Sequence, residues 1–153
     1  MVLLVDDYDD GRRSLAEFLA TRGFTVETAA DGREAVEKAK RVRPAIVIMD
    51  LAMPVMDGWE ATRELKAQPE TSSIPVIALT AYGHEDAHRR AMEAGCAEVI
   101  TKPVDPPRLE ERIRHHFAPR RPASSAVPPS RGPHQTRSHQ GELAGLPPAR
   151  RAP

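Results

Sequence analysis

The first 118 residues alternate between two patterns of apolar positions. Short runs that are mostly apolar and β-branched are followed by longer segments in which apolar residues recur every three or four positions. The short runs predict strands, and they fall at residues 2–5, 45–49, 75–79 and 99–101, with a weaker run at 24–28. Continuous apolar strands that alternate with amphipathic helices are typical of a parallel sheet covered on both faces. The pattern therefore predicts an α/β fold in which a strand–helix unit occurs five times.

Helical spacing fills the intervals between the predicted strands. Near the end of the pattern, Leu109, Ile113 and Phe117 repeat every four residues, which predicts an amphipathic helix. Gly23 and Gly95 stand where a helix is expected to end, because glycine readily adopts the left-handed conformation of a C-terminal cap. Other positions with helical spacing are Leu15, Phe18, Leu19, Val36, Ala39, Ala61, Leu65, Ala87, Ala91 and Ala94.

The composition changes after Phe117. Residues 119–153 contain eight prolines, six arginines and a single acidic residue, and they have few large apolar side chains. Such a segment cannot bury enough apolar surface to offset the entropy cost of ordering, which is about 1–2 kcal/mol per residue. We expect residues 1–118 to be the folded domain and residues 119–153 to be a disordered, Pro/Arg-rich tail. We expect no DNA-binding or enzymatic output domain after Phe117.

The overall charge of zero hides an asymmetry between these two parts. Residues 1–118 hold 16 basic and 21 acidic residues, a net charge of −5, and the tail carries +5. Because the tail has no aromatic residues that could stack on bases, we do not expect nucleic acid to be its partner. The single Cys96 excludes an intramolecular disulfide framework, and no apolar run approaches the roughly 20 residues of a membrane span. We therefore expect a cytoplasmic protein that does not bind membranes.

Polar residues follow the predicted strands and form the candidate site. Asp6 and Asp7 follow the first strand, Asp50 the third, Thr80 the fourth and Lys102 the fifth. In open parallel sheets, ligands bind beyond the carboxyl ends of the strands. These five residues are therefore expected to meet at one edge of the sheet.

The residue types at this edge favour magnesium and phosphoryl chemistry. Three carboxylates close together repel one another and raise at least one pKa, whereas a hard cation such as Mg²⁺ relieves the conflict. A carboxylate oxygen can also act as a nucleophile. Lys102 would supply a positive charge and Thr80 a hydroxyl donor to a phosphoryl group.

Four segments resemble the receiver domain of bacterial two-component response regulators. They are LLVDDYDD (3–10), IVIMDLAMPVMDGWE (46–60), IPVIALTA (74–81) and AGCAEVITKPVD (94–105), and they occur in family order and spacing. The resemblance covers residues 1–118. It implies a doubly wound, flavodoxin-like sheet of five parallel strands in the order 2-1-3-4-5, with helices on both faces.

The resemblance also implies a role for each site residue. Asp50 corresponds to the phosphoacceptor, which takes a phosphoryl group from a histidine kinase or phosphotransfer protein. Mg²⁺ would be held by Asp6, Asp7, Asp50 and the backbone carbonyl of Ala52. Thr80 corresponds to the switch hydroxyl and Lys102 to the lysine that pairs with the phosphoryl group, while Pro103 corresponds to a proline after a cis peptide bond.

Two departures from the family pattern bear on output. Val99 stands where the family commonly has Tyr or Phe as a second switch residue, so we expect output to rest on Thr80 and the loop near Tyr82. The first strand is also a residue or two shorter than is typical.

Trp59 is predicted to begin a helix in a partly exposed position.

Three functions are compatible with the sequence. The leading one is a phosphoacceptor switch that binds a downstream effector protein as a monomer or weak dimer, and that assists its own phosphorylation and dephosphorylation without being a turnover enzyme. The alternative is a receiver-fold binding module that is never phosphorylated. A magnesium-dependent phosphohydrolase is the third, but Ala52 occupies the position where such enzymes often carry a second aspartate.

Overall fold

A computed structural model describes residues 1–81 and 83–117, which form five strands and five helices in strict alternation. The predicted tail and Tyr82 lie outside the described residues. The strands are β1 (Val2–Val5), β2 (Val26–Ala29), β3 (Ile46–Asp50), β4 (Val76–Thr80) and β5 (Glu98–Thr101). The helices are α1 (Asp9–Thr21), α2 (Gly32–Val42), α3 (Gly58–Ala67), α4 (Glu85–Ala94) and α5 (Pro106–Phe117).

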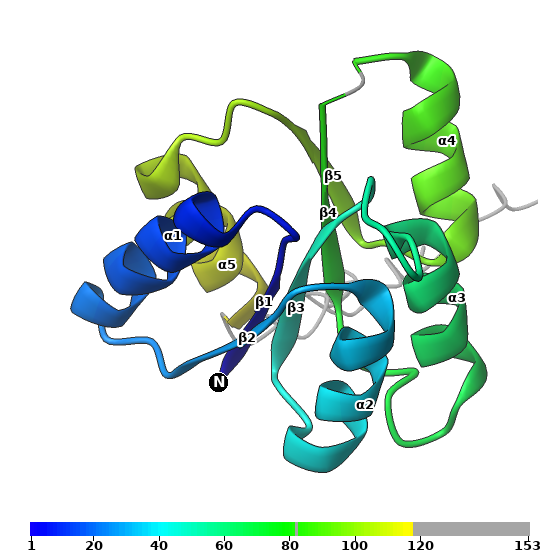
Figure 1. Cartoon of the computed structure of the whole chain (residues 1–153), viewed down its shortest axis with the longest axis horizontal. Helices are drawn as coiled ribbons and strands as arrows, with labels where there is room; N and C mark the ends of the chain where they lie inside the picture. The colour runs from blue at the N-terminus through cyan, green and yellow to red at the C-terminus, as the bar shows by residue number, and fades with distance from the viewer. Residues whose placement is uncertain (82, 118–153) are drawn as a thin grey trace, which may run out of the picture. The chain divides into compact units, whose positions relative to one another are not determined.

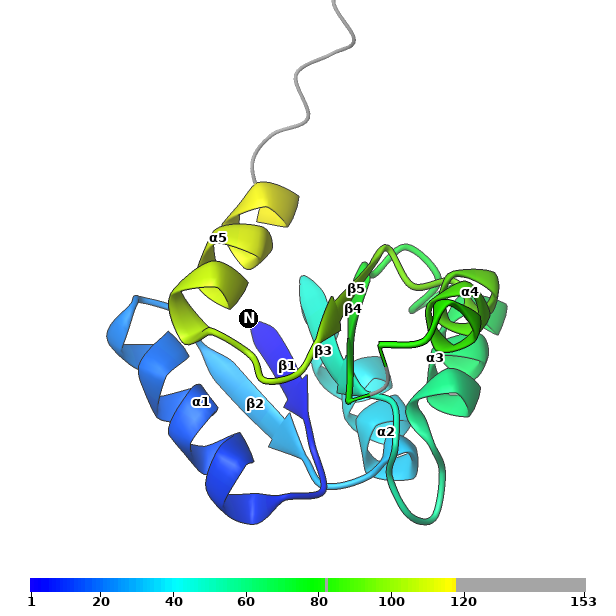
Figure 2. The ribbon, with the colours of Figure 1, turned by 90° about the horizontal axis from the view of Figure 1, so that it is seen from above.

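The strands form one parallel sheet in the order β2-β1-β3-β4-β5, which confirms the predicted fold class and strand order. Helices α1 and α5 cover one face, and α2, α3 and α4 cover the other (Figures 1 and 2). The observed strands begin and end within two residues of the predicted positions, and β1 matches its predicted range. As a result, Asp50 and Thr80 are the last residues of their strands rather than the first residues after them.

Each face of the sheet has its own aliphatic core, because successive strand residues point to opposite faces. On β1, Val2 and Leu4 face α1 and α5, whereas Leu3 and Val5 face the other three helices. All four side chains are fully buried. The central strands are therefore apolar on both sides, which explains why their sequences show no alternation of polar and apolar residues.

The helix ends follow local rules that the sequence contains. Asp31 and Asp57 cap α2 and α3 by accepting hydrogen bonds from the backbone N–H groups three residues later. Gly95 ends α4 with a φ of 109°, and Gly23 follows α1 with a φ of 92°, as expected for glycines at helix C-termini. The Lys102–Pro103 peptide bond is cis, as the family resemblance implied.

One prediction about packing is wrong. Trp59 in α3 is 8% exposed, so it is buried instead of partly exposed. The guanidinium of Arg90 in α4 lies 4.4 Å from the centre of its ring and covers it. A residue from a different helix thus buries this indole, and the local sequence around Trp59 contains no sign of that contact.

Candidate functional site

The sheet topology brings the predicted site residues to one edge. Asp6 and Asp7 directly follow β1, Asp50 ends β3, Thr80 ends β4 and Lys102 directly follows β5. Since these strands are parallel and adjacent in the order β1-β3-β4-β5, their carboxyl ends lie side by side. The backbone N–H of Lys102 donates to the carbonyl of Thr80 at 2.7 Å and so holds β5 and β4 together at this end.

The three aspartates form a compact cluster with the lysine beside it. Carboxylate oxygens of Asp6, Asp7 and Asp50 all lie within 4.8 Å of one another. The Lys102 Nζ is 3.3 Å from Asp50 Oδ2 and 3.6 Å from Asp6 Oδ2. Three negative charges and one positive charge therefore share a space the size of a small ion and its ligands.

Burial and charge both act on the central carboxylate. Asp50 is only 4% exposed, and this burial raises its pKa to about 6. That value is the net result, because the ammonium of Lys102 opposes the effect of burial, the charge of Asp6 adds to it, and the hydrogen bond from the Ala52 N–H lowers the pKa slightly. In the absence of a cation, burial and the charge of Asp6 therefore disfavour the ionised form of Asp50.

Hydrogen bonds fix the orientation of two of these carboxylates. Asp6 Oδ1 accepts from the backbone N–H of Tyr8 at 2.9 Å, and Asp50 Oδ1 accepts from that of Ala52 at 3.3 Å. The Arg12 guanidinium donates to the backbone carbonyl of Asp6 at 2.7 Å. Sequence reasoning missed this role of Arg12, since an arginine in an amphipathic helix carries no signal for a bond to a carbonyl of the preceding loop.

A glycine allows the loop after β3 to lie against the site. A Cβ atom on Gly58 would fall 2.2 Å from the Asp50 carbonyl oxygen and 2.8 Å from the Cα of Leu51. The Gly58 N–H also donates to the Leu51 carbonyl at 2.9 Å. Any side chain at this position would push α3 away from the end of β3, and with it the loop that carries Ala52.

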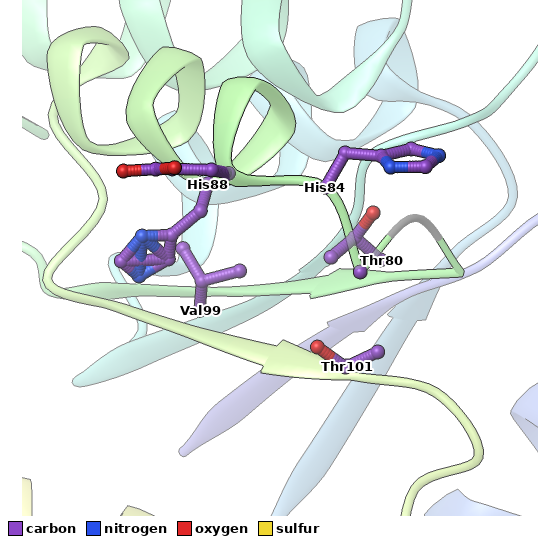
Figure 3. Close-up of a pocket in the computed structure, with 7 residues that line it drawn as sticks. Thr80, His84, His88, Val99 and Thr101 are labelled. Atoms are coloured by element: carbon purple, nitrogen blue, oxygen red, sulfur yellow. The ribbon is translucent and has the colours of Figure 1, made fainter.

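The side of the site away from the acids consists of Thr80 and Val99. Thr80 is 2% exposed, and Val99 of β5 packs against the edge of the core beside α4. Figure 3 shows both side chains on the side of the strands that faces α4. The structure therefore places Val99, at the position where the family resemblance implied an aromatic residue, near Thr80.

The donor set of the cluster fits a magnesium ion. All three side chains offer carboxylate oxygens, the hard ligands that Mg²⁺ prefers, and their spacing permits one ion to touch all three. A cation there would also relieve the electrostatic and burial effects that raise the pKa of Asp50. Among residues 1–81 and 83–117, this is the one group of three or more acidic, histidine or cysteine side chains spaced to hold a metal.

Comparison with known proteins identifies the family. The response regulator receiver domain family matches residues 2–114, so the chain belongs to the receiver domains of two-component response regulators. The response regulator PleD of Caulobacter vibrioides (strain NA1000 / CB15N) is 37% identical over 113 residues, which cover 74% of this chain and 25% of PleD. The chain thus spans about a quarter of the length of this relative.

Two solved structures show the same fold. The receiver domain of the sensor histidine kinase PA1611 from Pseudomonas aeruginosa PAO1, described with magnesium coordinated in its active site cleft, has a TM-score of 0.72 and 32% identity. The match covers 77% of this chain and 97% of that one. The CheX–CheY–BeF₃–Mg complex from Borrelia burgdorferi has a TM-score of 0.71 and 32% identity, and the match covers 77% of this chain and 89% of that one.

Within the described part of this chain, no helix is both long and apolar enough to span a membrane.

Proposed function

We propose that the protein is a phosphoacceptor switch whose receiver domain takes a phosphoryl group on Asp50. The observation that carries the proposal is the buried Asp50 carboxylate, which lies within ion-binding distance of Asp6 and Asp7 and 3.3 Å from the Lys102 ammonium. A histidine kinase or phosphotransfer protein supplies the phosphoryl group as phosphohistidine. Membership in the receiver family and the likeness to a magnesium-bound receiver support this assignment.

The proposed metal site comprises Asp6, Asp7, Asp50 and the Ala52 carbonyl. Bound Mg²⁺ supplies positive charge that neutralises the acids and the phosphoryl oxygens. The hydrogen bond from the Tyr8 N–H keeps Asp6 turned toward the cluster, and Arg12 holds the Asp6 backbone. The chain therefore presents a preorganised set of oxygen ligands at the edge of the sheet.

Asp50 performs the transfer as the nucleophile. One of its carboxylate oxygens forms a bond to phosphorus while the bond between phosphorus and the histidine nitrogen breaks, and the electron pair of that bond stays on the imidazole. Lys102 pairs with a peripheral phosphoryl oxygen, where negative charge is concentrated. The product is an aspartyl phosphate, and water later hydrolyses it, so the domain turns over only its own modification.

Thr80 transmits the change. Its hydroxyl donates to a phosphoryl oxygen of the aspartyl phosphate, and this contact draws the end of β4 and the start of α4 toward Asp50. The loop and α4 are repacked as a result, which changes the surface available to a downstream effector protein.

Phosphorylation on Asp50 is tested directly by mass. The purified chain is incubated with phosphoramidate, which carries a nitrogen–phosphorus bond like that of phosphohistidine, in the presence of Mg²⁺. Intact mass should increase by one phosphoryl group in the wild type and in the control Asp10→Asn, which lies outside the cluster, and should not change in Asp50→Asn. An unmodified wild type, or a modified Asp50→Asn, contradicts the proposal. Effector binding that is identical in wild type and Asp50→Asn would instead favour the unphosphorylated binding module.

A further inference from the structure

The polar atoms of Asp6 are held from three directions. Its backbone N–H donates to the carbonyl of Ala29 at 3.1 Å, which ties the residue to the end of β2. Its Oδ1 accepts from the Tyr8 N–H at 2.9 Å, and its backbone carbonyl accepts from the Arg12 guanidinium at 2.7 Å. The fourth polar atom, Oδ2, lies 3.6 Å from the Lys102 ammonium. Both the backbone and the side chain of Asp6 are therefore restrained at the edge of the cluster.

Arg12 is the side chain that supplies one of these restraints. One terminal nitrogen of its guanidinium donates to the Asp6 carbonyl, and the other donates to the carboxylate of Asp9 in the first turn of α1. The Arg12 side chain is 18% exposed, so most of it is shielded from solvent. Because the guanidinium is planar and its donors leave in fixed directions, the two bonds together fix the position of Asp6 relative to α1.

The charge of Arg12 does not explain its place beside an acidic cluster. A guanidinium near a site for a divalent cation repels that cation, and this repulsion alone would lower the affinity of the cluster for the ion. The ion pair with Asp9 offsets the charge of Arg12. What Arg12 contributes to the cluster is therefore restraint of Asp6 rather than electrostatic attraction.

Restraint of an oxygen ligand affects magnesium and calcium differently. Mg²⁺ requires a nearly regular octahedron with oxygens at about 2.0–2.1 Å, whereas Ca²⁺ accepts about six to eight oxygens at about 2.3–2.6 Å in variable arrangements. A set of ligands that cannot move apart favours the smaller ion, and a set that can relax loses this preference. Both ions carry two positive charges, so a change of nearby charge alters both affinities alike and leaves their ratio constant.

We propose that Arg12 is a positioning residue that gives the aspartate cluster its preference for Mg²⁺ over Ca²⁺. It holds the backbone of Asp6, so that the Asp6 carboxylate cannot move away from those of Asp7 and Asp50 to make room for the larger ion. Asp9 keeps the guanidinium in the orientation that this contact needs. The inference rests on the proposed function, which assigns the three clustered aspartates as metal ligands.

The affinities of Mg²⁺ and Ca²⁺ for the full chain, measured by isothermal titration calorimetry, test this role. In Arg12→Gln, Mg²⁺ binding should weaken at least about tenfold and Ca²⁺ binding by no more than about twofold. The control Arg13→Gln removes the same charge from the next position, which is exposed, and should leave the ratio of the two affinities within about twofold of wild type. A role in folding stability alone would change both affinities together, so their ratio isolates the restraint of Asp6.

A second measurement needs no metal. The Tyr8 N–H donates to Asp6 Oδ1, so its exchange with water reports how firmly Asp6 is held. In EDTA, NMR of the ¹⁵N-labelled chain should show this amide exchanging at least about fivefold faster in Arg12→Gln than in wild type, and within about twofold of wild type in Arg13→Gln. If thermal melting shows that Arg12→Gln is unfolded, Arg12→Lys replaces it in both tests with the same expected changes, because an ammonium lacks the planar pair of donors.

Several results would overturn the inference. A ratio of Mg²⁺ to Ca²⁺ affinity that is unchanged in Arg12→Gln, or that falls as far in Arg13→Gln, would each do so. So would an unchanged exchange rate of the Tyr8 N–H, since the position of Asp6 would then not depend on Arg12. A wild type that binds Ca²⁺ as tightly as Mg²⁺ has no preference for Arg12 to produce, and this result also contradicts the inference.

The inference and the proposed function fail in different ways. A chain that gains a phosphoryl group by intact mass but keeps its affinity ratio in Arg12→Gln supports the phosphoacceptor function and contradicts the role of Arg12. A chain whose ratio falls as expected but which is never phosphorylated supports the role of Arg12 and contradicts the phosphoacceptor function. A wild type that binds neither ion contradicts both the role of Arg12 and the proposed metal site.

Discussion

Replacing Asp50 by asparagine should stabilise the metal-free protein at alkaline pH. Asp50 is 4% exposed and lies close to Asp6, so the folded state bears a cost for its ionised form. Asparagine removes the charge but keeps an oxygen that can accept the hydrogen bond from the Ala52 N–H. Lys102 retains a negative partner in Asp6 at 3.6 Å, so the substitution leaves no isolated buried cation.

The magnitude and the sign follow from the pKa of Asp50. The pKa of Asp50 is about 6 in the folded protein, against 3.8 for an unperturbed aspartate. Because the pKa of Asp50 is raised in the folded state, its contribution to the free energy of unfolding is fully present below about pH 4. That contribution is lost as the pH rises through about 6. The full difference between the two pKa values corresponds to about 3 kcal/mol of unfolding free energy. Solvent screening at the open side of the cluster, where Asp7 is exposed, reduces this energy. We expect Asp50→Asn to gain about 1–3 kcal/mol at about pH 8.

The assay is urea unfolding of both proteins in EDTA, at about pH 8 and again at about pH 4.5. The gain should shrink by more than half at the lower pH, where Asp50 is mostly protonated in the folded wild type. Mg²⁺ at about pH 8 should stabilise the wild type more than Asp50→Asn and so narrow or reverse the gap. A variant that is less stable than wild type in EDTA at about pH 8, or a gain that is the same at both pH values, would refute the reasoning.

Three further predictions concern the loops around the site. Val55 has a φ of 69° and is 80% exposed, so Val55→Gly should raise the free energy of unfolding by about 1 kcal/mol, and urea melts that show a loss would contradict the assigned strain. Gly58→Ala should lower it by about 1–3 kcal/mol because of the clash with the Asp50 carbonyl, while the control Gly83→Ala, whose Cβ would meet nothing closer than 4.0 Å, should be nearly neutral. Asp7→Ala should reduce the rise in Tm that Mg²⁺ produces, and equal rises in the two proteins would argue against Asp7 as a ligand.

The order of the strands and helices, and the edge of the sheet at which the candidate site lies, could be predicted from the amino-acid sequence. Apolar strands such as Val2–Val5 and the glycines that end helices are local patterns, and each depends on a few neighbouring residues. Parallel strands place their carboxyl ends on one edge, so the positions of Asp6 and Asp50 followed from topology alone.

How these groups affect one another depends on packing between elements that are distant in the sequence. The raised pKa of Asp50 depends on its depth and on distances to Asp6 and Lys102, which are remote in sequence. The burial of Trp59 beneath Arg90 likewise arises between separate helices. Burial, electrostatic coupling and cavities are properties of packed surfaces, and a one-dimensional pattern of residue types does not contain the distances on which they depend.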